Sequence, residues 1–207
     1  MRSSMRPLLV TVLLAHAGVA VGAEDAFAKL RDRAKQLTGL GPFLDRYIGH
    51  CDDPFSKAEC LRNAARARQE AEGKLQYLIL DDRASEMVHP AAFDPKENQY
   101  RLDMTPYFEA DGRSLTEGSP KSQDEEGRPR VALLPIWAKL QDATPMDVER
   151  LFRTGNVRVQ IVFKPLGVWT MRRRNKKGTI EGVKAKFVAI RLSDARTGEE
   201  IAVRVRE

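Results

Sequence analysis

Residues 157–172 read VRVQIVFKPLGVWTMR, and their first half has the alternation of a β-strand that buries one face. Every second side chain there is apolar: Val157, Val159, Ile161 and Phe163. The next two residues, Lys164 and Pro165, predict a bend, because proline has no amide hydrogen to donate to a neighbouring strand. Residues 166–172 would then return as a second strand. This stretch therefore predicts a β-meander.

The meander continues toward the C-terminus. Residues 182–192, GVKAKFVAIRL, form the longest predicted strand. Its apolar positions change parity between Phe187 and Val188, which predicts a β-bulge or burial on both faces. Residues 194–198 predict a turn, and residues 201–205 alternate again as a last strand.

Shorter strands are predicted upstream of the meander. Residues 75–80 and 100–104 have strand patterns, and Asp111-Gly112 predicts a hairpin because glycine adopts positive φ without strain. Residues 116–130 are almost entirely polar or charged, so they predict a loop. Residues 131–137 form an apolar run whose proline favours the edge of a sheet.

Residues 24–73 predict helices. The first has apolar side chains at helical spacing, and Gly39 would end it: Phe27, Leu30, Ala34 and Leu37. Pro42 begins a second, short helix. Ser56 and Glu59 match a capping box for a third helix, which Gly73 would end.

One further helix interrupts the strands, between a cap at Thr144 and a stop at Gly155. Eight or nine short strands are too many for a flat open sheet in a chain of this length. We therefore predict an α+β fold in which N-terminal helices pack on a mainly antiparallel β-sandwich or partly open β-barrel of about eight strands. The helical segment 24–73 and the β domain 74–207 are expected to form one folding unit.

The first 23 residues have the pattern of a signal peptide. Arg2 and Arg6 precede an apolar run of about fifteen residues, whereas a membrane-spanning helix needs roughly twenty. Small residues before Glu24 predict cleavage after Ala23 and not an uncleaved anchor, and loss of the two arginines lowers the net charge from +6 to +4. The sequence thus predicts a periplasmic or secreted protein, with no transmembrane span after cleavage.

The two cysteines, Cys51 and Cys60, are predicted to form a disulfide in an oxidising compartment. Closing a loop of about ten residues stabilises a fold by roughly 2–3 kcal/mol in the chain-entropy model. A redox-active or metal-binding pair that includes His50 is the alternative. The spacing is not CxxC, and His89 is the one other histidine after the predicted cleavage site, so a four-ligand zinc set would need carboxylates. We therefore predict no metal site.

The sequence has no GxSxG, GxxxxGK[ST], HExxH, GxGxxG or CxxC motif, and we predict no cofactor. His50 and His89 are the histidines that follow the predicted cleavage site. The sequence places no nucleophile beside either of them. A hydrolase with an unrecognised site remains an alternative.

Two segments, LFRTGNVRVQIVFKPLGVW at 151–169 and RLSDARTGEEIAV at 191–203, resemble a family of uncharacterised exported proteins from myxobacteria. The similarity covers most of the β region. Its motifs form strands and turns and carry no chemistry, so the resemblance implies export and no particular activity.

A cluster of cations lies between residues 172 and 177, with Trp169 close to it in sequence. Five of these six residues are basic: Arg172, Arg173, Arg174, Lys176 and Lys177. The flanking strands predict that the cluster is the tip of a hairpin. Such a tip fits single-stranded nucleic acid, an anionic envelope partner, or a solvated end that keeps a sheet edge from pairing. Export and the absence of RNA-binding signatures argue against nucleic acid.

The sequence therefore favours an exported cell-envelope binding or adaptor protein without catalytic activity. Its basic hairpin, with Trp169, would contact an anionic envelope component or an acidic face of another protein. The alternative is a structural subunit of an envelope assembly, which an exposed apolar patch of more than a few hundred Å² would favour.

Overall fold

The computed structural model describes residues 18–49, 51, 53–80, 87–139, 144–174 and 177–206. Within these residues the protein has an α+β fold, and its sheets do not close into a barrel. The helices are α1 (Gly18–Asp32), α2 (Leu40–Ile48), α3 (Lys57–Ala71) and α5 (Pro145–Arg153). The strands are β1 (Lys35–Gln36), β2 (Gln76–Leu80), β3 (Val88–Asp94), β4 (Gln99–Met104), β5 (Tyr107–Ala110), β6 (Arg113–Glu117), β7 (Ser122–Gln123), β8 (Pro129–Arg130), β9 (Leu134–Lys139), β10 (Val157–Arg172), β11 (Thr179–Asp194) and β12 (Glu200–Val205).

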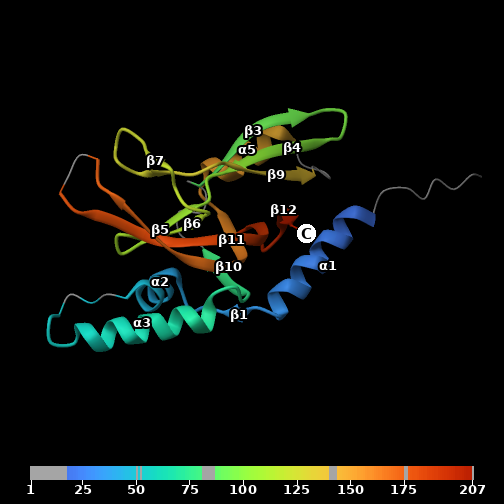
Figure 1. The fold of residues 1–207 in the computed structure, drawn as a ribbon. Coiled ribbons are helices and arrows are strands. Elements are labelled where there is room, and N and C mark those ends of the chain that lie inside the picture. Colours follow the sequence, from blue (N-terminus) through green and yellow to red (C-terminus); the bar gives the residue numbers. More distant parts are fainter. Residues whose placement is uncertain are drawn as a thin grey trace, which may run out of the picture.

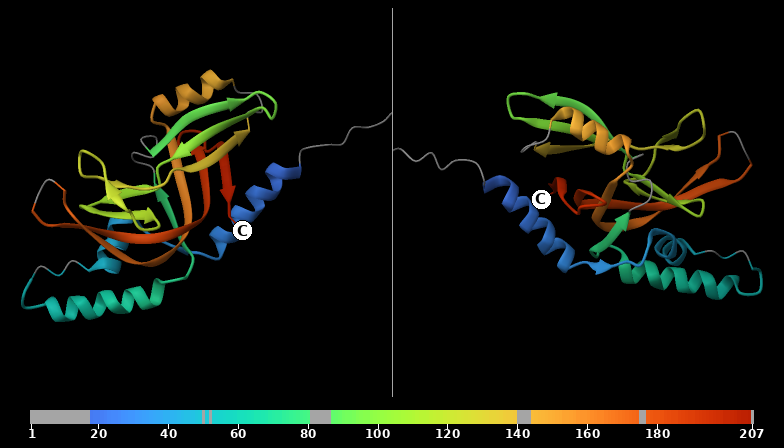
Figure 2. Two further views of the ribbon diagram at one scale, coloured as in Figure 1. Left: turned by 45° about the horizontal axis from the view of Figure 1, so that its top comes forward. Right: turned by 180° about the vertical axis from the view of Figure 1, so that it is seen from behind.

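The β10–β11 hairpin is the centre of a seven-stranded mixed sheet. β2 and then β1 extend the sheet beyond β10, while β6 with β5, and separately β12, pair on the side of β11. Two pairings are parallel, β1 with β2 and β6 with β11, and the others are antiparallel. Helices α2 and α3 lie on one side of this hairpin, and α5 with β3, β4 and β9 lies on the other (Figure 1 and Figure 2).

The predicted bend at Lys164-Pro165 is wrong, because β10 continues through both residues as one strand of 16 residues. A register shift between Pro165 and Gly167 leaves Leu166 without a partner on β11, and this bulge accommodates the proline in the strand. The carbonyl of Pro165 accepts a hydrogen bond from the amide of Gly73 at 2.8 Å, so the end of α3 is joined to the sheet here.

The predicted bulge in residues 182–192 is confirmed. Val162 pairs with Ala189 and Phe163 pairs with Phe187, so Val188 is the unpaired residue at which the buried positions change parity. Its carbonyl accepts a hydrogen bond from the amide of Arg206 at 2.8 Å. The strand itself is longer than predicted, with 16 residues.

The strands before α5 follow the sequence pattern in part. The Asp111-Gly112 hairpin is confirmed, with φ values of 52° and 73° at the two turn residues. β9 is an edge strand of the three-stranded sheet β3–β4–β9, as its proline predicts. The loop predicted at 116–130 is only partly correct, because β6 extends to Glu117 and β7 and β8 form a short hairpin inside it.

The sequence predicts caps at the starts of α5 and α3, and only the cap of α5 is confirmed. The hydroxyl of Thr144 accepts a hydrogen bond from the amide of Asp147, whose carboxylate accepts one from the amide of Thr144, and this capping box begins α5. The predicted box at the start of α3 does not form. Ser56 makes no side-chain hydrogen bond to the helix. The carboxylate of Asp53 instead accepts hydrogen bonds from the amides of Phe55 and Ser56, just before α3 begins.

The first predicted helix ends earlier than its apolar spacing suggests. α1 stops at Asp32, and residues 35 and 36 pair in parallel with β2, so Leu37 is not part of the helical stripe. Phe27 on α1 packs edge-on against Tyr77 of β2 at a centroid distance of 6.5 Å, in a small cluster with Val162 and Ala189. The main core includes α2 and α5 together with residues of both larger sheets.

Cys51 and Cys60 form the predicted disulfide, with Cα atoms 5.6 Å apart, and it connects the end of α2 to the first turn of α3. Arg68 makes a second connection, because its guanidinium donates hydrogen bonds of 2.8 Å to the carbonyls of Tyr47 and Ile48 at the C-terminus of α2. The disulfide and Arg68 therefore hold the same two helices at different points.

We expect the Cys51→Ser/Cys60→Ser variant to fold but to lose roughly 2–3 kcal/mol of its free energy of unfolding, because the unfolded chain regains the entropy of the open loop. Urea denaturation monitored by circular dichroism measures this loss. Reduction of the wild-type protein by dithiothreitol should produce a loss of the same size. An unchanged urea midpoint in both cases would show that the bond does not stabilise the fold.

Candidate anion-binding surface on the β10–β11 hairpin

The predicted position of the basic cluster at a hairpin tip is confirmed for the described residues. Arg172 and Thr179 are the last paired residues of β10 and β11, and the amide of Arg173 donates a hydrogen bond of 3.0 Å to the carbonyl of Gly178. The free end of the hairpin projects from the molecule on the side away from α1 (Figure 1 and Figure 2). Lys176, also predicted to belong to this cluster, lies outside the described residues.

The β7–β8 hairpin holds the base of this tip through one side chain. The amide nitrogen of Gln123 donates a hydrogen bond of 2.7 Å to the carbonyl of Arg172. Its amide oxygen accepts one of 3.0 Å from the backbone amide of Arg174. Gln123 thus fixes two backbone positions of the tip while the side chains of both arginines remain exposed.

These two hairpins form an open groove of about 820 Å³. Its described lining includes five cations and no acidic side chain; the cations are Lys121, Arg172, Arg173, Arg174 and Lys177. None of the five forms an ion pair with another residue in the part of the chain that the structure describes. Unpaired cations around one concave surface give a positive potential that attracts anions.

Lys121 is a cation of this surface that the sequence did not reveal. About fifty residues separate it from the cluster, and only the pairing of Gln123 with the hairpin brings it there. No local pattern in residues 116–130 predicts such a contact.

Trp169, predicted as a possible contact residue, is buried with 7% of its surface exposed. Its indole nitrogen donates a hydrogen bond of 2.9 Å to the hydroxyl of Thr116, which is fully buried. The indole therefore reaches from β10 across Gly182 of β11 to Thr116 of β6, and it does not line the groove.

The other described candidate residues, Cys51, Cys60 and His89, lie far from the basic cluster in the chain and do not gather into a common site. Cys51 and Cys60 are bonded to each other, and His50 lies outside the described residues. His89 is exposed on β3, and its imidazole makes no hydrogen bond with another described residue. Among the described residues, no three side chains of histidine, cysteine or acid type gather as metal ligands would.

No helix in the described ranges combines the length and the apolar character needed to cross a bilayer.

Comparison with known proteins identifies a family and gives no functional relative. Neither a curated protein nor a solved structure matches the chain. One family model matches it over residues 1–207, and its description is "Family of unknown function (DUF6066)". The chain belongs to this family.

Proposed function

We propose that this protein is an exported cell-envelope binding or adaptor protein that holds a phosphate-bearing anionic surface in the groove between its β7–β8 and β10–β11 hairpins. One observation carries the proposal. Five cations without ion-pair partners among the described residues line this groove, and no described acid lines it.

The chemistry of the cations favours phosphate groups. Three of them are arginines, whose planar guanidinium groups bind phosphate oxygens with two parallel hydrogen bonds. One exposed cation contributes only about 1 kcal/mol at an anionic membrane surface. Several cations held together by Gln123 act on the same surface, so their contributions combine without further ordering of the tip.

Export is part of this proposal and rests on the N-terminal pattern of the sequence. The α1 residues that contact the sheet, Phe27 and Leu30, follow Ala23, so cleavage there leaves these contacts in place. A disulfide in a chain with two cysteines fits an oxidising compartment. The similarity to exported myxobacterial proteins also supports export.

The test uses the chain isolated from the periplasm or medium, whose N-terminal residue also checks cleavage after Ala23. We expect it to bind vesicles of phosphatidylglycerol and phosphatidylcholine, and not vesicles of phosphatidylcholine alone, in a cosedimentation assay. About 1 M salt should abolish binding, because the screening length falls to about 3 Å. Replacement of Arg172, Arg173, Arg174 and Lys177 by Gln should weaken binding roughly 100-fold or more, with thermal stability nearly unchanged.

A control variant removes the same number of charges elsewhere. It replaces Lys57, Arg62, Arg66 and Lys96, which are exposed and outside the groove, by Gln. Its affinity should fall far less than that of the hairpin variant. Equal losses in the two variants would mean that only net charge matters, and the proposed groove would be wrong. Binding to an acidic protein but not to anionic vesicles would contradict the choice of a phosphate surface.

A further inference from the structure

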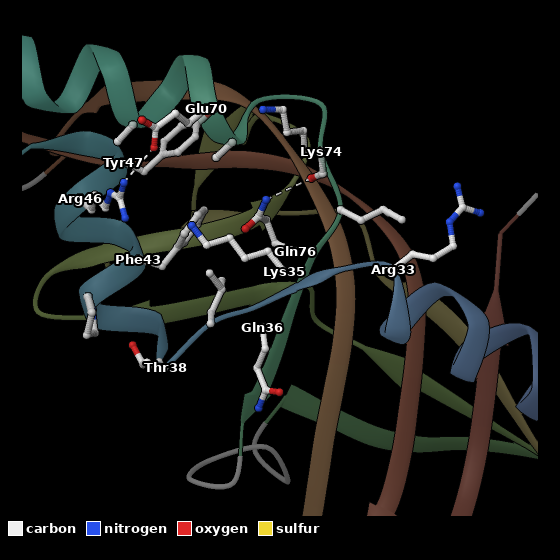
Figure 3. Close-up of a pocket in the computed structure, with 16 residues that line it drawn as sticks. Arg33, Lys35, Gln36, Thr38, Phe43, Arg46, Tyr47, Glu70, Lys74 and Gln76 are labelled. Carbon is white, nitrogen blue, oxygen red and sulfur yellow. Dashed lines mark hydrogen bonds and ion pairs between the residues drawn. The ribbon is translucent and has the colours of Figure 1, made fainter.

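A second hollow lies on another part of the molecule, between helices α2 and α3 and the chain that enters β1 and β2 (Figure 3). Its volume is about 780 Å³. Cavities of roughly 300–1,000 Å³ are typical of sites for small molecules. It shares no lining residue with the groove at the basic hairpin.

Apolar side chains from all of these segments form much of its wall: Leu37, Pro42, Phe43, Ala67, Ala71 and Leu75. Phe43 is held from behind, because its ring packs edge-on against the buried ring of Phe163 at 5.4 Å. Tyr47 is also part of the wall, and burial raises its pKa to about 12, so it remains neutral. This part of the wall is therefore largely apolar, uncharged and supported by the core.

The buried side chain of Gln76 in this wall uses little of its hydrogen-bonding capacity. Gln76 is 3% exposed, and the one hydrogen bond that its side chain makes with a described residue is a long contact of 3.5 Å from its amide nitrogen to the carbonyl of Lys74. Figure 3 shows this amide among the lining side chains, between Phe43 and Lys74. An amide buried in this way is stabilised when a ligand completes its hydrogen bonds.

The rim of the cavity is cationic. Arg33, Lys35 and Lys74 form no ion pair with other described residues, whereas Arg46 is paired with Glu70 at 2.9 Å. Glu70 is the one acid in the described lining, so this pair leaves an excess of positive charge around the opening. Lys35 pairs with Gln76 between β1 and β2, and Lys74 precedes Gln76 by two residues.

We propose that this cavity binds a small amphipathic anion. Its apolar body would lie against Phe43, Leu37 and Leu75, and its carboxylate or phosphate group would accept hydrogen bonds from Lys35, Lys74 and the amide of Gln76. An apolar wall next to unpaired cations favours such a molecule over a neutral one, because an anion alone satisfies the ammonium groups that it covers. A polar anion without an apolar body would leave the wall unfilled.

The test is isothermal titration calorimetry of the full chain with dodecanoate, dodecyl phosphate, dodecanol and dodecylamine below their micelle concentrations. Both anions should bind, while dodecanol and the cationic amine should bind about tenfold more weakly or not at all. The ratio of the two anion affinities distinguishes a site for fatty carboxylates from one for lipid phosphates. Binding of dodecanol as tight as that of the anions, or no binding by either anion, would overturn the proposal.

Two variants test the residues. Lys35→Gln/Lys74→Gln changes exposed side chains. It should lower the affinity for both anions about tenfold or more without altering the weak binding of dodecanol. Lys57→Gln/Lys96→Gln removes the same charge away from the cavity and should leave all affinities unchanged. Equal losses in the two variants would overturn the assigned residues. The hairpin variant of the preceding subsection should bind dodecanoate normally, so the two proposals fail independently.

Discussion

The Gly182→Ala variant is expected to lose about 3 kcal/mol or more of its free energy of unfolding, or to fail to fold. Gly182 lies in β11 between Trp169 of β10 and Ser114 of β6, and it pairs with both. A Cβ atom at this position would lie 2.5 Å from the carbonyl oxygen of Ser114 and 2.5 Å from the Trp169 ring. Both contacts are far too short, so a central strand has to move.

Equilibrium denaturation in urea measures this loss. Gly39→Ala is the matched control, because Gly39 has an extended backbone with φ of 167° and its new Cβ would only reach Pro42 at 3.7 Å. The control should change stability by less than about 1 kcal/mol. Adding Trp169→Leu to Gly182→Ala should not restore stability, because the Ser114 carbonyl remains in place. A Gly182→Ala protein as stable as the control would show that β6 and β11 separate at little cost.

Gly182 also shows where prediction from the sequence ends. The sequence places Gly182 at the start of a strand, but only the parallel pairing of β6 with β11 explains why a side chain cannot fit there. β5 and β6 form a local hairpin whose turn could be predicted, because Asp111 and Gly112 determine it by themselves. The pairing of β6 with β11 joins residues about seventy positions apart, and no local pattern encodes it.

Two other predictions also differ in whether they depend on neighbouring residues or on residues remote in the chain. The cap of α5 was predictable because Thr144 and Asp147 satisfy each other's amides within one turn. The bend at Pro165 was wrong because a bulge in β10 accommodates a proline as well as a turn does. That choice depends on β11 and on the Gly73 amide, which are remote in the chain.

The candidate sites also combine features that the local sequence shows with features that depend on packing between remote segments. The run of cations at 172–177 is visible in the sequence, and the predicted strands on either side of it indicate that it lies at the tip of a hairpin. Gln123, Lys121 and the burial of Trp169 all depend on where the β7–β8 hairpin and β6 pack. The cavity beside Gln76 has no sequence signature, because its lining comes from α2, α3, β1 and the start of β2.

The Phe163→Ala variant is expected to lose about 3–5 kcal/mol of its free energy of unfolding. Phe163 is fully buried in β10, and its ring lies 5.4 Å from Phe43 of α2 and 6.4 Å from Phe187 of β11. Phe187 in turn packs against Phe108 of β5 at 6.1 Å. Removing the Phe163 ring therefore leaves a cavity where α2 packs against the sheet. We expect the hydrogen-bonded strands around it not to move far enough to fill this cavity.

Chemical denaturation of two further variants separates loss of packing from loss of apolar surface. Phe163→Leu refills much of the space and should cost about 1.5 kcal/mol or less. Phe55→Ala removes the same ring from a site that is 99% exposed, and it should change stability by about 0.5 kcal/mol or less. A loss below about 1 kcal/mol for Phe163→Ala would mean that α2 repacks on the sheet. In that case the wall of the cavity beside Gln76 would change as well, because Phe43 belongs to both.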